Sequence, residues 1–192
     1  MYERPIDPMV EANARLTGWT AVVLFVLLAA EGATILSLRR LLPEHFFIGF
    51  LLIPPVLLKM GSTGYRFVRY YTGDRRYRSA GPPRIGLRLL APVVVVSTVV
   101  LFGSGVELWL FGDRYGTIWI TAHKLSFVVW FGATGIHVLA YLARAPRLAW
   151  ADLRAPLRGA AGRRGLIVAS LLLGLVLALA TSQWATPFMP TG

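Results

Sequence analysis

The chain has 192 residues, of which 56% are hydrophobic and only 15% charged, a composition typical of a membrane protein. It contains no cysteine, which excludes disulfides, thiolate metal sites, iron–sulfur clusters and covalently attached c-type haem. The formal net charge of +11 would suit a nucleic-acid-binding protein, but the charges are confined to a few connections, which disfavours that class.

Five apolar stretches are long enough to cross about 30 Å of hydrocarbon. We expect them at about 17–38, 45–67, 87–110, 118–142 and 166–182. None shows the alternation of a barrel strand, so α-helices are predicted. The second contains Pro54 and Pro55, which remove helix hydrogen bonds and are expected to kink it. The sequence therefore predicts an all-α integral membrane protein, a five-transmembrane helical bundle that forms a single domain over 1–192.

Positive charge gathers in two of the connections. The second carries Lys59, Arg66, Arg69, Arg75, Arg76, Arg78, Arg84 and Arg88, and the fourth carries Arg144, Arg147, Arg154, Arg158, Arg163 and Arg164. The opposite connections hold only Arg39, Arg40 and Arg114. Basic connections stay cytoplasmic, so we expect a multi-pass protein of the cell inner (plasma) membrane, with a cytoplasmic N-terminus and an external C-terminus. The first stretch is too long for a cleaved signal, and a short interfacial helix is expected at about 146–153.

The three histidines are the most informative residues. His123 and His137 are fourteen residues apart in the fourth stretch, so they share one helix face at a separation of roughly 21 Å along the axis. His45 begins the second stretch, which runs in the same direction, so His45 and His123 are expected at similar depth near the outer face. Ionisable residues at membrane depth are usually functional, and imidazoles from facing helices can hold a haem iron. We therefore expect haem b between these two histidines.

His137 lies deeper, and its level on the second helix falls at Lys59 and Met60. A methionine thioether can oppose histidine on haem iron, whereas lysine could do so only as the neutral amine and is expected to reach the cytoplasmic interface. His137 could instead form a hydrogen bond with a hydroxyl or a backbone carbonyl. The sequence leaves one haem and two haems both open.

Parallel second and fourth helices with this histidine pair resemble the cytochrome b of quinol-oxidising respiratory complexes, over residues 16–143. The haem-binding membrane subunits of formate dehydrogenases and hydrogenases are a looser parallel. The resemblance implies a four-helix haem-binding core in which His45 and His123 match the outer ligand pair and His137 matches half of an inner pair. Lys59 stands where the family pattern has a histidine.

The same family places glycines where the backbone passes close to a porphyrin. Gly18 and Gly32 in the first helix have the family's spacing of fourteen, Gly49 lies one turn below His45, and Gly105 lies at the outer level of the third helix. Small residues are also common wherever transmembrane helices approach closely.

Glu31 and Glu107 are expected near the level of His45 and His123. One of them could accept a hydrogen bond from an axial imidazole or exchange a proton with a quinone, and an ion pair with Arg39, Arg40 or Arg114 is the simpler alternative.

These features predict a membrane b-type cytochrome that transfers electrons between the quinone pool and a partner redox subunit. With almost no extramembrane mass, the chain is expected to be an electron-transfer subunit of an oxidoreductase complex rather than a complete enzyme. The expected partners are membrane lipid, other redox subunits and a quinone, and no nucleic acid. The alternative is a haem-free membrane anchor or assembly subunit, whose histidines would be interhelical hydrogen-bond partners. A small transporter is disfavoured because only one helix is interrupted.

Overall fold

The computed structural model describes residues 7–82 and 85–183, so Arg84 and the C-terminal tail lie outside the described part. Within it there are seven helices and no strand. The helices are α1 (Pro8–Ile35), α2 (Leu42–Tyr71), α3 (Arg75–Ser79), α4 (Ile85–Phe111), α5 (Ile118–Tyr141), α6 (Arg144–Arg154) and α7 (Ala160–Ser182). Five of them, α1, α2, α4, α5 and α7, are long and apolar enough to cross a membrane. The prediction of an all-α chain with five such helices is confirmed.

The long helices extend beyond the apolar stretches that predicted them. α1 begins at Pro8 rather than near residue 17, because the Asp7 carboxylate accepts a hydrogen bond from the Met9 backbone N–H at 2.9 Å and caps the helix. Pro8 suits the first turn, and Glu11 in that turn favours the positive end of the helix dipole. The apolar stretch therefore marks the part that can cross a membrane, whereas the cap marks where the helix starts.

α2 remains helical through Pro54 and Pro55, both of which are buried. Pro55 has no N–H to donate to the carbonyl of Leu51, which leaves that carbonyl free of its usual helix partner. Gly174 of α7 packs on this carbonyl so closely that a Cβ at position 174 would overlap the Leu51 oxygen. The proline pair thus lies beside a close approach of α2 and α7, and it does not divide the helix.

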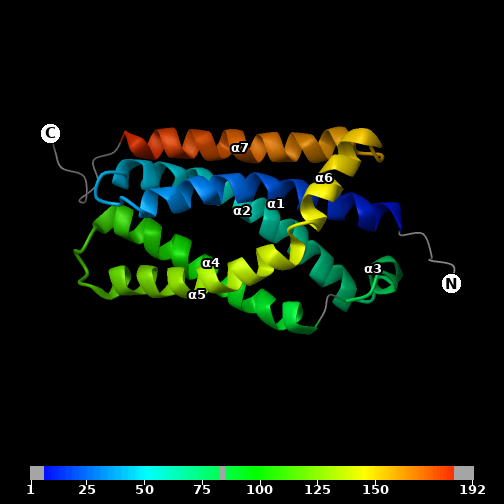
Figure 1. The fold of residues 1–192 in the computed structure, drawn as a ribbon, viewed down its shortest axis with the longest axis horizontal. Coiled ribbons are helices and arrows are strands. Elements are labelled where there is room, and N and C mark those ends of the chain that lie inside the picture. The colour runs from blue at the N-terminus through cyan, green and yellow to red at the C-terminus, as the bar shows by residue number, and fades with distance from the viewer. Residues whose placement is uncertain (1–6, 83–84, 184–192) are drawn as a thin grey trace.

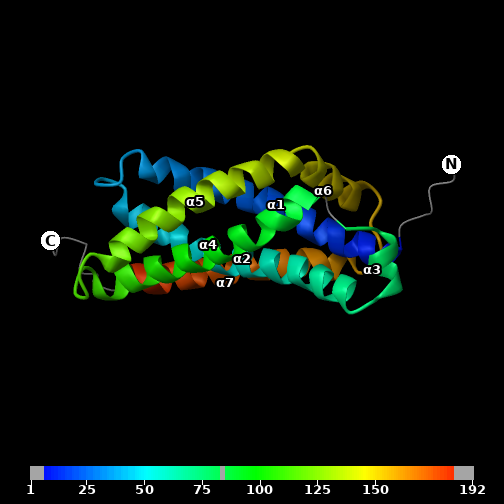
Figure 2. The ribbon, with the colours of Figure 1, turned by 90° about the horizontal axis from the view of Figure 1, so that it is seen from below.

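The long helices lie side by side in layers (Figure 1). α2 packs against both α1 and α7, while α4 and α5 pack against each other and meet the rest mainly through α2. Seen from below, α5 and α4 lie in front of this group (Figure 2). α2 and α5 have few close backbone approaches to each other.

The two ends of the bundle differ in what they carry (Figure 1). The start of α1, the helices α3 and α6 and the start of α7 lie at one end, called the basic end because the arginine-rich connections are there. The connections at 36–41 and 112–117 and the last turn of α7 lie at the other, called the histidine end. α1 therefore begins at the basic end and α7 finishes at the histidine end, as expected when an odd number of long helices run back and forth.

The short helix expected at about 146–153 is present as α6 and crosses α1 at the basic end (Figure 1). Trp150 is exposed on it, with the Arg154 guanidinium 4.8 Å from the centre of its ring. α3 lies in the arginine-rich connection between α2 and α4, where no helix was predicted. It forms because the Asp74 carboxylate caps it by accepting from the Arg76 backbone N–H at 2.9 Å.

A buried ionic network fixes α6 to the bundle. Asp152 is fully buried, and its carboxylate is paired with Arg15 of α1 at 3.8 Å and with Arg163 of α7. Arg164 lies 3.7 Å from the other carboxylate oxygen, and Arg15 also binds Glu11 at 2.6 Å. Charges this far from water persist only when paired, so these contacts lock three helices together.

Candidate functional site

His45 and His123 lie together at the histidine end. His45 is in the first turn of α2 and His123 in the first half of α5, and their ring centres are 6.3 Å apart with the planes perpendicular. The expectation that these two residues occupy the same depth is confirmed. No other histidine is part of this cluster, because His137 lies much further along α5.

The Nδ1 atom of His45 faces two oxygen acceptors from α1. The Glu31 carboxylate is 2.8 Å away and the Thr34 hydroxyl oxygen 3.1 Å away. Thr34 donates its own proton to the Glu31 backbone carbonyl at 2.6 Å, so its oxygen is left to accept. The hydrogen-bond network therefore assigns the His45 proton to Nδ1 and leaves the Nε2 lone pair free.

His123 has the same tautomer by a different route. Its Nδ1 lies 3.1 Å from the Leu101 carbonyl and 3.1 Å from the Ser104 hydroxyl oxygen, both on α4. Ser104 donates its proton to the Val100 carbonyl at 2.6 Å, so both of these oxygens accept from His123. Neither histidine has a hydrogen bond at Nε2 within the described residues. Two imidazoles with protonated Nδ1 and free Nε2 atoms have the form that a metal ligand requires.

The candidate glycines have separate roles. Gly105 lets α4 approach His123, since a Cβ there would lie 3.2 Å from the imidazole Cε1 atom. A Cβ added at Gly49 would lie 3.8 Å from the Glu31 carboxylate, an ordinary contact distance. Gly32 is exposed and has open space around it, whereas Gly18 packs on Leu148 of α6, where a Cβ would be 2.8 Å from the leucine side chain. Gly18 therefore lies at a close helix contact, which was the alternative explanation for the pair, whereas Gly32 makes no such contact.

Glu31 pairs with His45 rather than with the arginines proposed as its alternative partners. Glu107 is half-buried in α4, and one of its carboxylate oxygens is buried with no hydrogen bond in the described structure. The structure thus distinguishes two carboxylates that the sequence left equivalent.

The inner level does not repeat the outer one. Lys59 was predicted to reach the cytoplasmic interface, but its ammonium group instead donates to the Thr17 carbonyl of α1 at 2.8 Å. It lies within electrostatic range of His137, whose half-buried ring is 5.0 Å from that of Tyr141. The His137 Nδ1 atom has no hydrogen-bond partner among the described residues. Met60 is half-buried and makes no polar contact with His137 in the described structure.

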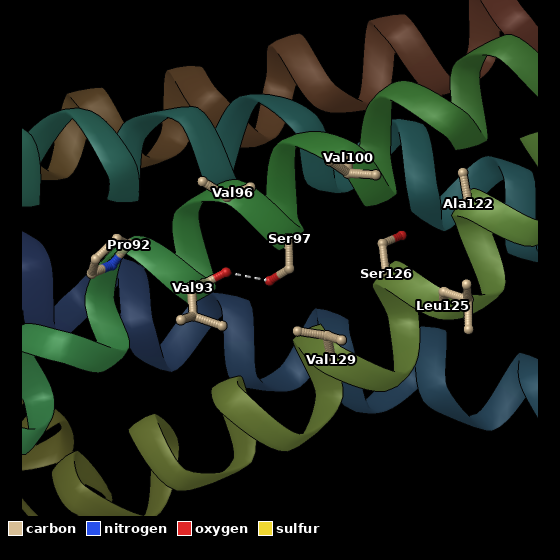
Figure 3. Close-up of a pocket in the computed structure, with 9 residues that line it drawn as sticks. All are labelled: Pro92, Val93, Val96, Ser97, Val100, Ala122, Leu125, Ser126 and Val129. Atoms are coloured by element: carbon tan, nitrogen blue, oxygen red, sulfur yellow. Dashed lines mark hydrogen bonds between the residues drawn. The ribbon is translucent and has the colours of Figure 1, made fainter.

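A groove of about 600 Å³ lies between α4 and α5 (Figure 3). It is lined by Pro92, Val93, Val96, Ser97, Val100, Ala122, Leu125, Ser126 and Val129. Both serine hydroxyls donate to carbonyls of their own helices: Ser97 to the Val93 carbonyl at 2.7 Å and Ser126 to the His123 carbonyl at 3.1 Å. With no titratable side chain in its lining, this groove offers an apolar surface rather than a reactive site.

Sequence reasoning missed the Asp152 network, because the arginines at 144–164 were fully explained by topology. The available signal was that Asp152 is the one acidic residue in this basic segment. Within the described residues, no group of three or more His, Cys, Asp or Glu side chains could hold a metal ion by itself. A haem differs in this respect, because its porphyrin supplies the equatorial ligands and the protein adds only axial ones.

Searches of protein-family models, curated proteins and solved structures found no match to this chain.

Proposed function

We propose that the protein is a membrane-embedded b-type cytochrome that holds one haem between His45 and His123. The observation that carries the proposal is the pair of facing imidazoles, each with its proton held on Nδ1 and its Nε2 atom free. Imidazole nitrogens bind metal ions at about 2 Å, so two rings that share one metal have their centres about 6 Å apart. The observed 6.3 Å agrees with this spacing, as it also does with a direct edge-to-face ring contact.

The surroundings also suit a flat, apolar ring system. α2 and α5 have few close backbone approaches although their histidines meet, and Gly105 brings the α4 backbone up to His123. A four-helix core of α1, α2, α4 and α5 over about 16–143 would then enclose the haem, while α7 covers the far side of α2.

In this function, His45 and His123 would hold the haem iron through their Nε2 atoms, and their acceptors on α1 and α4 would hold the two rings in place. The bound haem supplies one-electron transfer. The apolar helices exclude water and keep the pair near the histidine end. With that end outside, electrons would pass between a membrane quinone and a partner redox subunit at the outer face. The orientation rests on the arginine-rich connections of the basic end being cytoplasmic.

A second haem at His137 would need Met60 or Lys59 as the opposite ligand. Lys59 already binds the Thr17 carbonyl, which makes it a poor candidate. We therefore propose one haem per chain, with Met60 as the remaining ligand should two be found.

The test is a reduced-minus-oxidised optical spectrum of the purified protein, with haem quantified per chain and haem supply ensured during expression. We expect about one b-type haem per chain, lost in His123→Ala and in His45→Ala, because each supplies one axial ligand. His137→Ala is the matched control and should keep the full content. A wild-type chain without haem would contradict the proposal and favour a haem-free anchor or assembly subunit.

A further inference from the structure

The two histidines of the candidate haem site are held by unequal acceptors. His45 faces a carboxylate, with 2.8 Å between its Nδ1 and the Glu31 Oε1 atom. His123 faces only neutral oxygens, the Leu101 carbonyl and the Ser104 hydroxyl. A carboxylate acceptor makes the imidazole a stronger electron donor than a neutral acceptor does, because the negative charge stabilises the partly positive ring. The two sides of the site are therefore chemically distinct.

We propose that Glu31 is a positioning residue that fixes the tautomer and ring orientation of His45 and lowers the reduction potential of the bound haem. The inference rests on the proposed function, since it requires His45 to bind the iron. A more basic axial imidazole stabilises oxidised iron over reduced iron, which shifts the potential downward.

The surroundings of Glu31 support this role. Its side chain is 15% exposed and that of His45 20%, so the pair is shielded from the water that would weaken its interaction. Gly49 lies one turn beyond His45, and a Cβ added there would lie 3.8 Å from the bound carboxylate oxygen, an ordinary contact distance. Glu31 is therefore in contact range of α2 at two levels, at His45 and at Gly49.

Thr34 completes the arrangement. Its hydroxyl bridges the Glu31 backbone carbonyl, at 2.6 Å, and the His45 Nδ1 atom, at 3.1 Å. One turn of α1 thus presents two acceptors to a single imidazole. When the carboxylate is removed, Thr34 still holds the His45 proton, so the ligand orientation should survive while its basicity falls.

The experiment is a redox titration of the haem-loaded protein in wild type, Glu31→Gln and Glu107→Gln, with haem content and the electron paramagnetic resonance spectrum measured in parallel. Glu107→Gln is the matched control, because Glu107 is also a part-buried acid at this end but makes no hydrogen bond or ion pair with either histidine in the described structure. Glu31→Gln should keep its haem. Its preference for oxidised over reduced iron should fall about tenfold. The reduction potential should therefore rise by about 59 mV, the value for a one-electron couple. Its resonance spectrum should shift with the weaker ligand.

A potential in Glu31→Gln that matches the Glu107→Gln control would overturn the inference while leaving the haem assignment intact. If Glu31→Gln loses haem while its helical content is unchanged, the haem content of Glu31→Asp shows whether a carboxylate at this position is what holds His45. Recovery of haem with aspartate supports a carboxylate that holds His45, and loss in both variants overturns it. A wild-type chain without haem is a separate outcome, which refutes the proposed function before any variant is compared.

Discussion

The basic end and the histidine end both bury polar groups, but they use them differently. At the basic end Asp152 is surrounded by Arg15 and Arg163, and the charges compensate one another. At the histidine end the hydrogen bonds of His45 and His123 engage one nitrogen of each ring and leave the other unused. A polar cluster whose buried charges are balanced by their neighbours is explained by stability alone. One that leaves a ring nitrogen of two neighbouring imidazoles without a partner in a membrane protein is not explained by stability alone.

The same contrast separates the outer and inner levels of α2 and α5. Fourteen residues beyond His45 and His123 are Lys59 and His137, which lie within electrostatic range of each other. Because α2 runs through its prolines without a break, His45 and Lys59 lie on one continuous helix, as His123 and His137 do in α5. A single residue type therefore distinguishes the level with two imidazoles from the level with one.

The largest effect is expected from Lys59→His, which would make the inner level match the outer one. The new imidazole would face His137, and haem content should rise from about one toward two per chain, measured by the same optical assay. Lys59→Leu is the control, because it also removes the bond to the Thr17 carbonyl but adds no ligand. An unchanged haem content in Lys59→His would show that the two levels are not equivalent.

Asp152→Ala should have the next largest effect, because it leaves Arg15 and Arg163 buried without their counter-charge. Breaking a buried ion pair from one side costs about 3–5 kcal/mol of the free energy of unfolding. Thermal unfolding in detergent, followed by circular dichroism, measures the loss. Asp113→Ala, at an exposed position of the opposite end, is the control and should be near neutral.

The same variant tests how independent the two ends are. If they are held separately, Asp152→Ala should melt earlier yet bind as much haem as the wild type at low temperature, since distant sites usually act additively. Equal melting of Asp152→Ala and Asp113→Ala would show that the network contributes little.

These two ends also show what the sequence could and could not predict. The histidine pair was found because helix geometry turns spacing into depth, and five long apolar helices followed from composition. The Glu31–His45 contact was anticipated only as one of two carboxylate options, since spacing along α1 and α2 does not fix which side chains face each other. The partners of Arg15 and Lys59 were missed because both depend on how helices distant in sequence pack. A basic residue near a helix end looks the same in sequence whether it reaches headgroups or a buried acceptor.

The smallest of these effects is expected midway between the ends, where α7 packs on α2. Gly174→Ala would place a methyl group on the Leu51 carbonyl that Pro55 leaves without a helix donor. Backbone cannot yield as a flexible side chain does, so α7 must move outward, at a cost of about 1–3 kcal/mol. Gly135→Ala in α5 is the matched control, because nothing lies within 4 Å of its added Cβ, and alanine should there be neutral or slightly stabilising. Unfolding in detergent compares the two, and equal melting temperatures would contradict the close approach. Because α2 carries both His45 and Lys59, a loss of haem in Gly174→Ala beyond its loss of stability would show that the position of α2 against α7 also sets the spacing of the histidines.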